Sequence, residues 1–175
     1  MRIFIVGFMG SGKSTSGRKI ARELHCKFID LDRYIELEKG ASLMDIFRYE
    51  GEDIFRGYER EALERICSEY NNVVVATGGG TPCFNDNMSY LNEMGITVYL
   101  RHPSGQLASR LSESYNPRPL IKGMTLEELR VYVAEKLSER EVFYNSSTLV
   151  VESPSRNISG IVEIIREQIN KDIIF

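Results

Sequence analysis

The sequence lacks the features that mark membrane-spanning, disulfide-linked and zinc-binding proteins. No apolar run approaches the ~18 residues that a membrane helix needs, so we expect no membrane partner. The three cysteines, Cys26, Cys67 and Cys83, are odd in number and have no C-x-x-C spacing. This argues against disulfides and a zinc site and predicts reduced thiols in a cytoplasmic protein. The two histidines, His25 and His102, have no metal-ligand partner at helical spacing, and we expect both at the surface.

The sequence also lacks an excess of basic residues. Its 22 Lys and Arg against 25 Asp and Glu give a net charge of −3, whereas general nucleic-acid binding needs a basic surface. We therefore expect no nucleic-acid partner, and any anionic ligand must be held by local arginines. The length of 175 residues predicts one domain over residues 1–175, which we expect to be a monomer. An apolar segment begins at residue 2, so we expect no targeting peptide.

Short apolar segments and helical patterns alternate along the chain. Strands are expected at residues 2–6, 27–30, 73–76, 97–100 and 148–151. This alternation predicts an α/β fold with a parallel sheet covered by helices on both faces. Two segments interrupt it: a helical insertion at about 33–70, too long for a single crossover, and a Pro- and Gly-containing loop at about 112–124, which has the length of a lid.

The first expected strand runs into a phosphate-binding motif. Residues 7–14 match G-x-x-x-x-G-K-[ST], and a helix is expected from 13 to 24. The glycines let the backbone wrap a triphosphate, Lys13 reaches the β- and γ-phosphates, and the Ser14 hydroxyl suits Mg²⁺. The helix N-terminus adds a favourable field for phosphate. The sequence therefore predicts nucleoside triphosphate binding by the residues of this loop and first helical turn: Gly10, Ser11, Gly12, Lys13, Ser14 and Thr15.

Polar or glycine-rich segments follow the next two expected strands. Asp30 and Asp32 close the second strand and, in an extended chain, point the same way, so both carboxylates are expected beside the phosphate loop. One would order magnesium waters while the other accepts a proton from a substrate hydroxyl. The alternative is a turn in which Asp32 caps the next helix. Gly78, Gly79 and Gly80 follow the third strand and permit positive φ and close approach of a ligand to the backbone.

Four arginines are candidates for holding an anion. Arg56 lies in the helical insertion, Arg110 precedes the lid loop and Arg118 lies within it, and Arg140 stands one turn before Tyr144. Taken singly, each is more often a solvated surface residue, since an exposed ion pair stabilises by only about 0–1 kcal/mol. Phosphoryl transfer favours a functional role for the lid arginine Arg118, because the transition state is stabilised by positive charge.

Together these segments resemble the shikimate kinases. The phosphate loop, Asp30-x-Asp32, Gly-Glu-x-x-Phe-Arg ending at Arg56, the Gly78–Gly80 run, Arg118-Pro119-Leu120 and Arg140-x-x-x-Tyr144 follow the order of that family over nearly the whole chain. The resemblance implies a P-loop NTPase fold of the nucleoside-monophosphate-kinase type, with a five-stranded parallel sheet in order 2-3-1-4-5. It also implies transfer of the γ-phosphoryl group of ATP, with Mg²⁺, to the 3-hydroxyl of shikimate.

The resemblance further implies a role for each matching residue. Asp32 would bond the reacting hydroxyl as candidate base, and Asp30 would support Mg²⁺ through water, with Ser14 as direct ligand. Arg56 and Arg140 would clamp the shikimate carboxylate, with the backbone of the Gly78, Gly79 and Gly80 run beside the ring. Lys13 and Arg118 would act on the transferring phosphates. Arg110 and Arg156 look similar to the positions that flank the adenine.

Other functions compete with this interpretation. A kinase of the same fold that acts on gluconate or a nucleoside monophosphate would share the phosphate loop and lid, but has no reason to match GExxFR together with GGG. A GTP-dependent switch needs N-K-x-D after a later strand, where this chain reads Leu100-Arg101-His102-Pro103. A silent nucleotide-binding module predicts loss of Lys13, Asp32 or Arg118, and all three are present.

Overall fold

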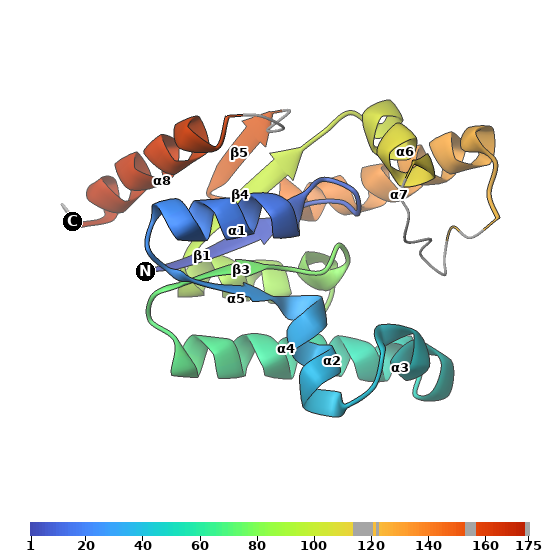
Figure 1. Cartoon of the computed structure of the whole chain (residues 1–175), viewed down its shortest axis with the longest axis horizontal. Helices are drawn as coiled ribbons and strands as arrows, with labels where there is room; N and C mark the ends of the chain where they lie inside the picture. Colours follow the sequence, from blue (N-terminus) through green and yellow to red (C-terminus); the bar gives the residue numbers. More distant parts are fainter. Residues whose placement is uncertain (114–120, 122, 153–156, 174–175) are drawn as a thin grey trace.

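A computed structural model describes residues 1–113, 121, 123–152 and 157–173, and is built on one parallel sheet (Figure 1). The five strands stand in the order β2-β3-β1-β4-β5, as the sequence predicts. Their bounds are β1 Arg2–Val6, β2 Lys27–Asp30, β3 Val73–Ala76, β4 Ile96–Arg101 and β5 Leu149–Glu152. The first three match the expected segments, and the ends of the last two differ from them by one residue.

Side chains of the central strand alternate between two hydrophobic cores, one on each face of the sheet. Ile3 and Ile5 pack in the core that α1 (Lys13–Glu23) and α8 (Ile158–Ile173) cover. Phe4 and Val6 pack in the core with residues of α4 (Glu52–Glu69), α5 (Asn87–Met94), α6 (Ser104–Ser112) and α7 (Leu126–Tyr144). All four strand residues are fully buried. Burial on both faces explains why the strand is continuously apolar.

The expected helical insertion consists of three helices. They are α2 (Leu31–Lys39), α3 (Leu43–Tyr49) and the long α4, and Figure 1 shows α3 projecting beyond the end of the sheet. Ser42 caps α3 by accepting from the backbone N–H of Asp45, and Gly40 ends α2 with a left-handed φ of 64°. These caps divide the insertion into short helices that wall one side of the site.

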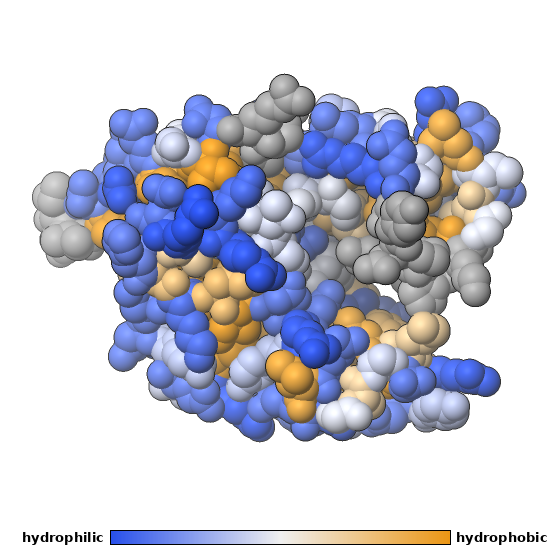
Figure 2. Space-filling model, in the orientation of Figure 1, coloured by the Kyte–Doolittle hydropathy of each residue, from blue (hydrophilic) through white to orange (hydrophobic). Residues whose placement is uncertain are grey.

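The carboxyl ends of the parallel strands lie at one edge of the sheet, where ligands bind in open α/β folds. The phosphate loop follows β1, Asp30 ends β2, the glycine run and η1 (Thr81–Cys83) follow β3, and His102 follows β4. Figure 2 shows a mainly hydrophilic surface on the viewed face, with hydrophobic residues in separate patches. Among the described helices, none has the length and apolar character to cross a membrane.

Candidate functional site

The loop after β1 has the backbone conformation that its glycines predict. Gly7, Gly10 and Gly12 have φ values of 140°, 79° and 86°, which L side chains rarely adopt. Gly12 directly precedes α1, so the unpaired N–H groups of the first turn begin at the loop. Lys13 is buried, and its Nζ donates to the carbonyls of Gly7 at 2.8 Å and Phe8 at 3.0 Å. The loop is thus preorganised around the ammonium group.

A polar pocket of about 350 Å³ opens beside this loop. It is lined by Gly10, Gly12, Lys13, Ser14, Thr15, Asp30, Asp32, Thr77 and Gly79. Its hydroxyl and carboxylate oxygens are the ligands that Mg²⁺ prefers. No group of three or more His, Cys, Asp and Glu residues is placed to hold a metal in the described part of the chain. The donor set of this pocket therefore fits Mg²⁺.

The two aspartates reach this pocket, but not as residues of an extended strand. β2 ends at Asp30, and Asp32 already belongs to the first turn of α2. The capping alternative is also wrong in its residue: Asp30, not Asp32, caps the helix, by accepting from the backbone N–H of Arg33 at 3.3 Å. Since Asp30 caps the helix, the Asp32 side chain does not serve as the cap, and it lines the pocket from the first turn of α2.

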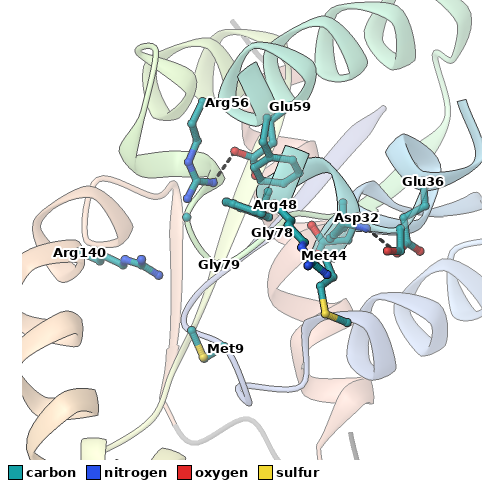
Figure 3. Close-up of a pocket in the computed structure, with 15 residues that line it drawn as sticks. Met9, Asp32, Glu36, Met44, Arg48, Arg56, Glu59, Gly78, Gly79 and Arg140 are labelled. Atoms are coloured by element: carbon teal, nitrogen blue, oxygen red, sulfur yellow. Dashed lines mark hydrogen bonds and ion pairs between the residues drawn. The ribbon is translucent and has the colours of Figure 1, made fainter. Parts of the chain in front are cut away.

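A second cavity, of about 550 Å³, adjoins the polar pocket and is called here the arginine pocket (Figure 3). Its walls combine arginines, carboxylates, apolar side chains and the glycine run. The lining residues are Met9, Asp32, Glu36, Ser42, Leu43, Met44, Phe47, Arg48, Phe55, Arg56, Glu59, Gly78, Gly79, Gly80 and Arg140. Asp32 and Gly79 line both cavities, so the two meet at these residues.

Arg56 is buried in the arginine pocket and is held by carboxylates of its own helix. Its Nη1 donates to Glu59 at 2.6 Å, and its Nη2 donates to Glu52 at 2.7 Å. Glu59 is fully buried and also accepts from the Thr81 hydroxyl. Burial raises the pKa of the Glu59 carboxyl, and the neighbouring Arg56 opposes the rise. This network fixes a guanidinium away from bulk water, where a charged hydrogen bond to a ligand is stronger.

The segment Gly78–Gly80 needs glycine because larger residues would clash with neighbouring side chains, not because of its backbone angles. The expectation of positive φ is wrong, because none of the three glycines has a left-handed φ. A Cβ on Gly78 would lie 2.8 Å from side-chain oxygens of Asp32, Glu59 and Thr81. On Gly80 it would lie 2.7 Å from Nη2 of Arg56. Glycine therefore lets charged side chains approach the backbone of this segment closely.

Arg140 reaches the same pocket from α7. Figure 3 shows Arg140 and Arg56 on one side of the cavity and Asp32 across from them. The Arg140 guanidinium lies 5.7 Å from the centre of the Phe8 ring. One turn later, the hydroxyl of fully buried Tyr144 donates to the carbonyl of Gly79 at 2.5 Å. This bond ties α7, and with it Arg140, to the glycine run.

His102 and Arg110 lie behind the phosphate loop. The expectation of a surface position holds for exposed His25, but is wrong for His102, which is 2% exposed. His102 Nε2 lies 3.2 Å from the Ser11 carbonyl, and Arg110 Nη1 lies 3.4 Å from the Gly10 carbonyl. Burial and the nearby Arg110 lower the pKa of His102. The expected sites at Arg118 and Arg156 lie outside the described residues.

Sequence reasoning did not identify several residues of the arginine pocket. Glu59 could have been predicted from the sequence, because it lies three residues after Arg56 on α4, and that spacing places the pair on one helix face. Phe47 and Phe55, whose ring centres are 4.4 Å apart, supply apolar wall and come from two different helices. Arg48 lines the pocket from α3. The assembled cavity offers guanidinium groups to a carboxylate, apolar wall to a ring, and a carboxylate to a hydroxyl.

Comparison with known proteins agrees with this geometry. The sequence profile of the family described as shikimate kinase matches residues 9–170. A shikimate kinase of Azobacteroides pseudotrichonymphae is 40% identical over 168 residues, which cover 96% of this chain and 99% of that protein. The shikimate kinase structure from Bacteroides thetaiotaomicron has a TM-score of 0.89 at 36% identity, covering 97% and 98% of the two chains. One from Acinetobacter baumannii, in complex with shikimate, has a TM-score of 0.84 at 31% identity and covers 98% and 93%.

Proposed function

The chain belongs to the shikimate kinase family, and on that premise we propose how its residues phosphorylate the 3-hydroxyl of shikimate with ATP. Members of this family are ATP-dependent kinases, and this chain is one. The observation that carries the residue assignment is the meeting of the polar pocket and the arginine pocket at Asp32 and Gly79. A phosphoryl donor in the first and an acceptor in the second would face each other there.

The polar pocket holds the triphosphate in this proposal. Backbone N–H groups of residues 10–15 surround the phosphates, and the Lys13 ammonium group exchanges its loop carbonyls for β- and γ-phosphate oxygens. Ser14 and, through water, Asp30 would hold Mg²⁺, which supplies charge neutralisation for the transferring phosphoryl group. Arg110, behind the loop, would reach the adenine side together with Arg156.

The arginine pocket holds shikimate. Arg56 and Arg140 receive its single carboxylate, because two planar guanidinium groups match a carboxylate better than lysines would. Hydrogen bonds to a charged group contribute about 1.5–3 kcal/mol each. Phe47 and Phe55 border the shikimate ring. The Gly78–Gly80 backbone, which carries no side chains, lies beside the ring. Glu59 acts by holding Arg56 in place.

Transfer occurs at the junction of the two pockets. The Asp32 carboxylate accepts the hydrogen bond of the 3-hydroxyl and takes up its proton, while the hydroxyl oxygen bonds to the γ-phosphorus. The bond from that phosphorus to the β,γ-bridging oxygen breaks, and its electron pair leaves with ADP. The loose transition state needs alignment and charge stabilisation more than a strong base. The lid arginine Arg118 would supply charge and exclude water.

A coupled ADP-release assay with Mg-ATP tests this function directly. Shikimate is compared with gluconate, CMP and AMP as acceptors at equal concentrations. Turnover with shikimate alone is the expected result. Turnover with gluconate or a nucleoside monophosphate instead would keep the kinase and refute the roles of Arg56 and Arg140. No turnover with any acceptor would favour a silent nucleotide-binding module.

We also propose a cytoplasmic, monomeric enzyme that acts on a small molecule, without membrane or nucleic-acid partners. Cys26, Cys67 and Cys83 are free thiols, which supports a reducing compartment. The net charge of −3 supports local rather than general anion binding. Sedimentation at micromolar protein tests the monomer, and a mass near 40 kDa would contradict it, because one chain is 20.0 kDa.

A further inference from the structure

His102 has no role in the proposed phosphoryl transfer, yet it is buried next to the phosphate loop, where the sequence predicted a surface residue. It follows β4 directly, is 2% exposed and lies between the phosphate loop and α6. Both ring nitrogens have polar neighbours: Nδ1 is 2.7 Å from Gln106 Oε1, and Nε2 is 3.2 Å from the Ser11 carbonyl oxygen. A buried ring with two specific polar neighbours is a positioned group rather than a space-filling one.

The Nε2 atom also has a third neighbour. Arg110 Nη1 lies 3.3 Å from it and 3.4 Å from the Gly10 carbonyl oxygen. A neutral imidazole has one N–H and one lone pair. With the proton on Nδ1, the ring donates to Gln106 and Nε2 accepts from Arg110. With the proton on Nε2, the ring donates to the Ser11 carbonyl, and Arg110 is no longer held by the ring.

The contact with Ser11 matters because of peptide geometry. In a trans peptide the C=O of one residue and the N–H of the next point in opposite directions. A Ser11 carbonyl turned to His102 therefore directs the Gly12 N–H away from His102, and Gly12 lines the polar pocket.

We propose that His102 is a positioning residue of the nucleotide site: with its proton on Nε2, it donates to the Ser11 carbonyl and so sets the Ser11–Gly12 peptide. The proposal rests on the proposed function, in which the loop binds ATP phosphates and Arg110 reaches the adenine side. His102 touches neither substrate; it acts on the groups that do. The ring works in its neutral form, because burial and the Arg110 charge both disfavour a second proton.

The test compares ADP affinity by calorimetry and steady-state kinetics in matched variants. His102→Ala is expected to weaken ADP binding and raise the KM for ATP about tenfold, the effect of one buried hydrogen bond, with the KM for shikimate unchanged. His102→Gln is expected to recover ADP affinity to within about threefold of the parent, since its amide nitrogen can donate to the Ser11 carbonyl. Ser109→Ala, an exposed change on α6, serves as the control and should match the parent.

Several results would overturn the proposal. One is an ADP affinity in His102→Ala equal to that of the parent protein. Another is an ADP affinity in His102→Gln as low as in His102→Ala, when both variants have the melting temperature of the parent protein. If His102→Ala does not fold, Gln106→Ala decides, because Gln106 is exposed and its loss frees Nδ1. We expect that variant to raise the KM for ATP about threefold, and no rise would refute the coupling.

Failure of the proposed function gives a different pattern. A parent protein that binds ADP but does not phosphorylate shikimate would refute the acceptor assignment and leave the role of His102 to be decided by ADP affinity. A parent protein that phosphorylates shikimate, with ADP affinity insensitive to His102, would refute only the positioning role.

Discussion

A single methyl group at Gly80 should disable the carboxylate clamp without touching the nucleotide. Gly80 has φ −88° and ψ −22°, which alanine adopts without strain, so Gly80→Ala acts through space alone. The added Cβ would lie 2.7 Å from Nη2 and 2.8 Å from Nη1 of Arg56, well inside the 3.4 Å where ordinary contact begins. Glu52 and Glu59 hold the guanidinium on its other sides, so Arg56 must leave its position to make room.

The magnitude follows from the bond that Arg56 would make to the substrate carboxylate. A hydrogen bond to a charged group contributes about 1.5–3 kcal/mol, which corresponds to about 10- to 150-fold in binding. We therefore expect the KM for shikimate to rise about 10- to 100-fold in Gly80→Ala. The KM for ATP should stay within about twofold, since the three atoms nearest to the new methyl group all belong to Arg56, which does not line the polar pocket.

The matched control is Gly57→Ala, the same substitution one residue after Arg56. A Cβ there would meet nothing within 4 Å, and Gly57 lies inside α4. This variant should keep both KM values and raise the free energy of unfolding by about 0.5–1 kcal/mol, the cost of glycine in a helix. Initial rates of ADP release, with each substrate varied in turn, measure all three proteins. A wild-type KM for shikimate in Gly80→Ala would refute the assignment of Arg56 to the carboxylate.

Further predictions concern the other site residues and the buried histidine. Arg140→Ala should raise the KM for shikimate about tenfold or more and leave ATP binding nearly intact; an unchanged KM would contradict the clamp. Lys13→Ala should lower kcat by at least about 10²-fold while shikimate binding, measured by calorimetry, survives. Asp32→Asn should lower kcat about 10²- to 10⁴-fold, and a kcat near wild type would leave Asp32 only an orienting role. The pKa of His102 is lowered from its usual 6.5, so unfolding binds a proton; the free energy of unfolding should fall as pH drops below 6.5, and this slope should be smaller in His102→Gln.

The sheet and the phosphate loop could be predicted because their determinants are local. Continuous apolar segments such as Ile3–Val6 mark strands buried on both faces, and the G-x-x-x-x-G-K-S spacing requires a particular backbone path. The strand order came from resemblance, since it depends on which strands pair, and pairing is not written in any one segment.

The details of the site were less predictable because they depend on distant neighbours. Asp30 and Asp32 both line the polar pocket, but the extended geometry predicted for them is wrong, since the helix begins at Leu31, two residues before an extended segment through Asp32 would allow. Glycine is needed at residues 78 and 80 because the side chains of Asp32 and Glu59 crowd Gly78 and that of Arg56 crowds Gly80, from positions 19 or more residues away in the sequence. The sequence around residues 78–80 does not indicate which distant side chains will contact this segment.

The sequence by itself determined the chemical class of the protein: a nucleotide loop after the first strand, an acidic pair after the second, and arginines suited to an anionic acceptor. The tertiary structure alone decided which groups meet. It joined the two pockets at Asp32 and Gly79, buried Glu59 against Arg56, and placed His102 under the phosphate loop. The physical reason is that residue identity and spacing fix local conformation, whereas burial and ion pairing arise only when separate strands and helices pack together.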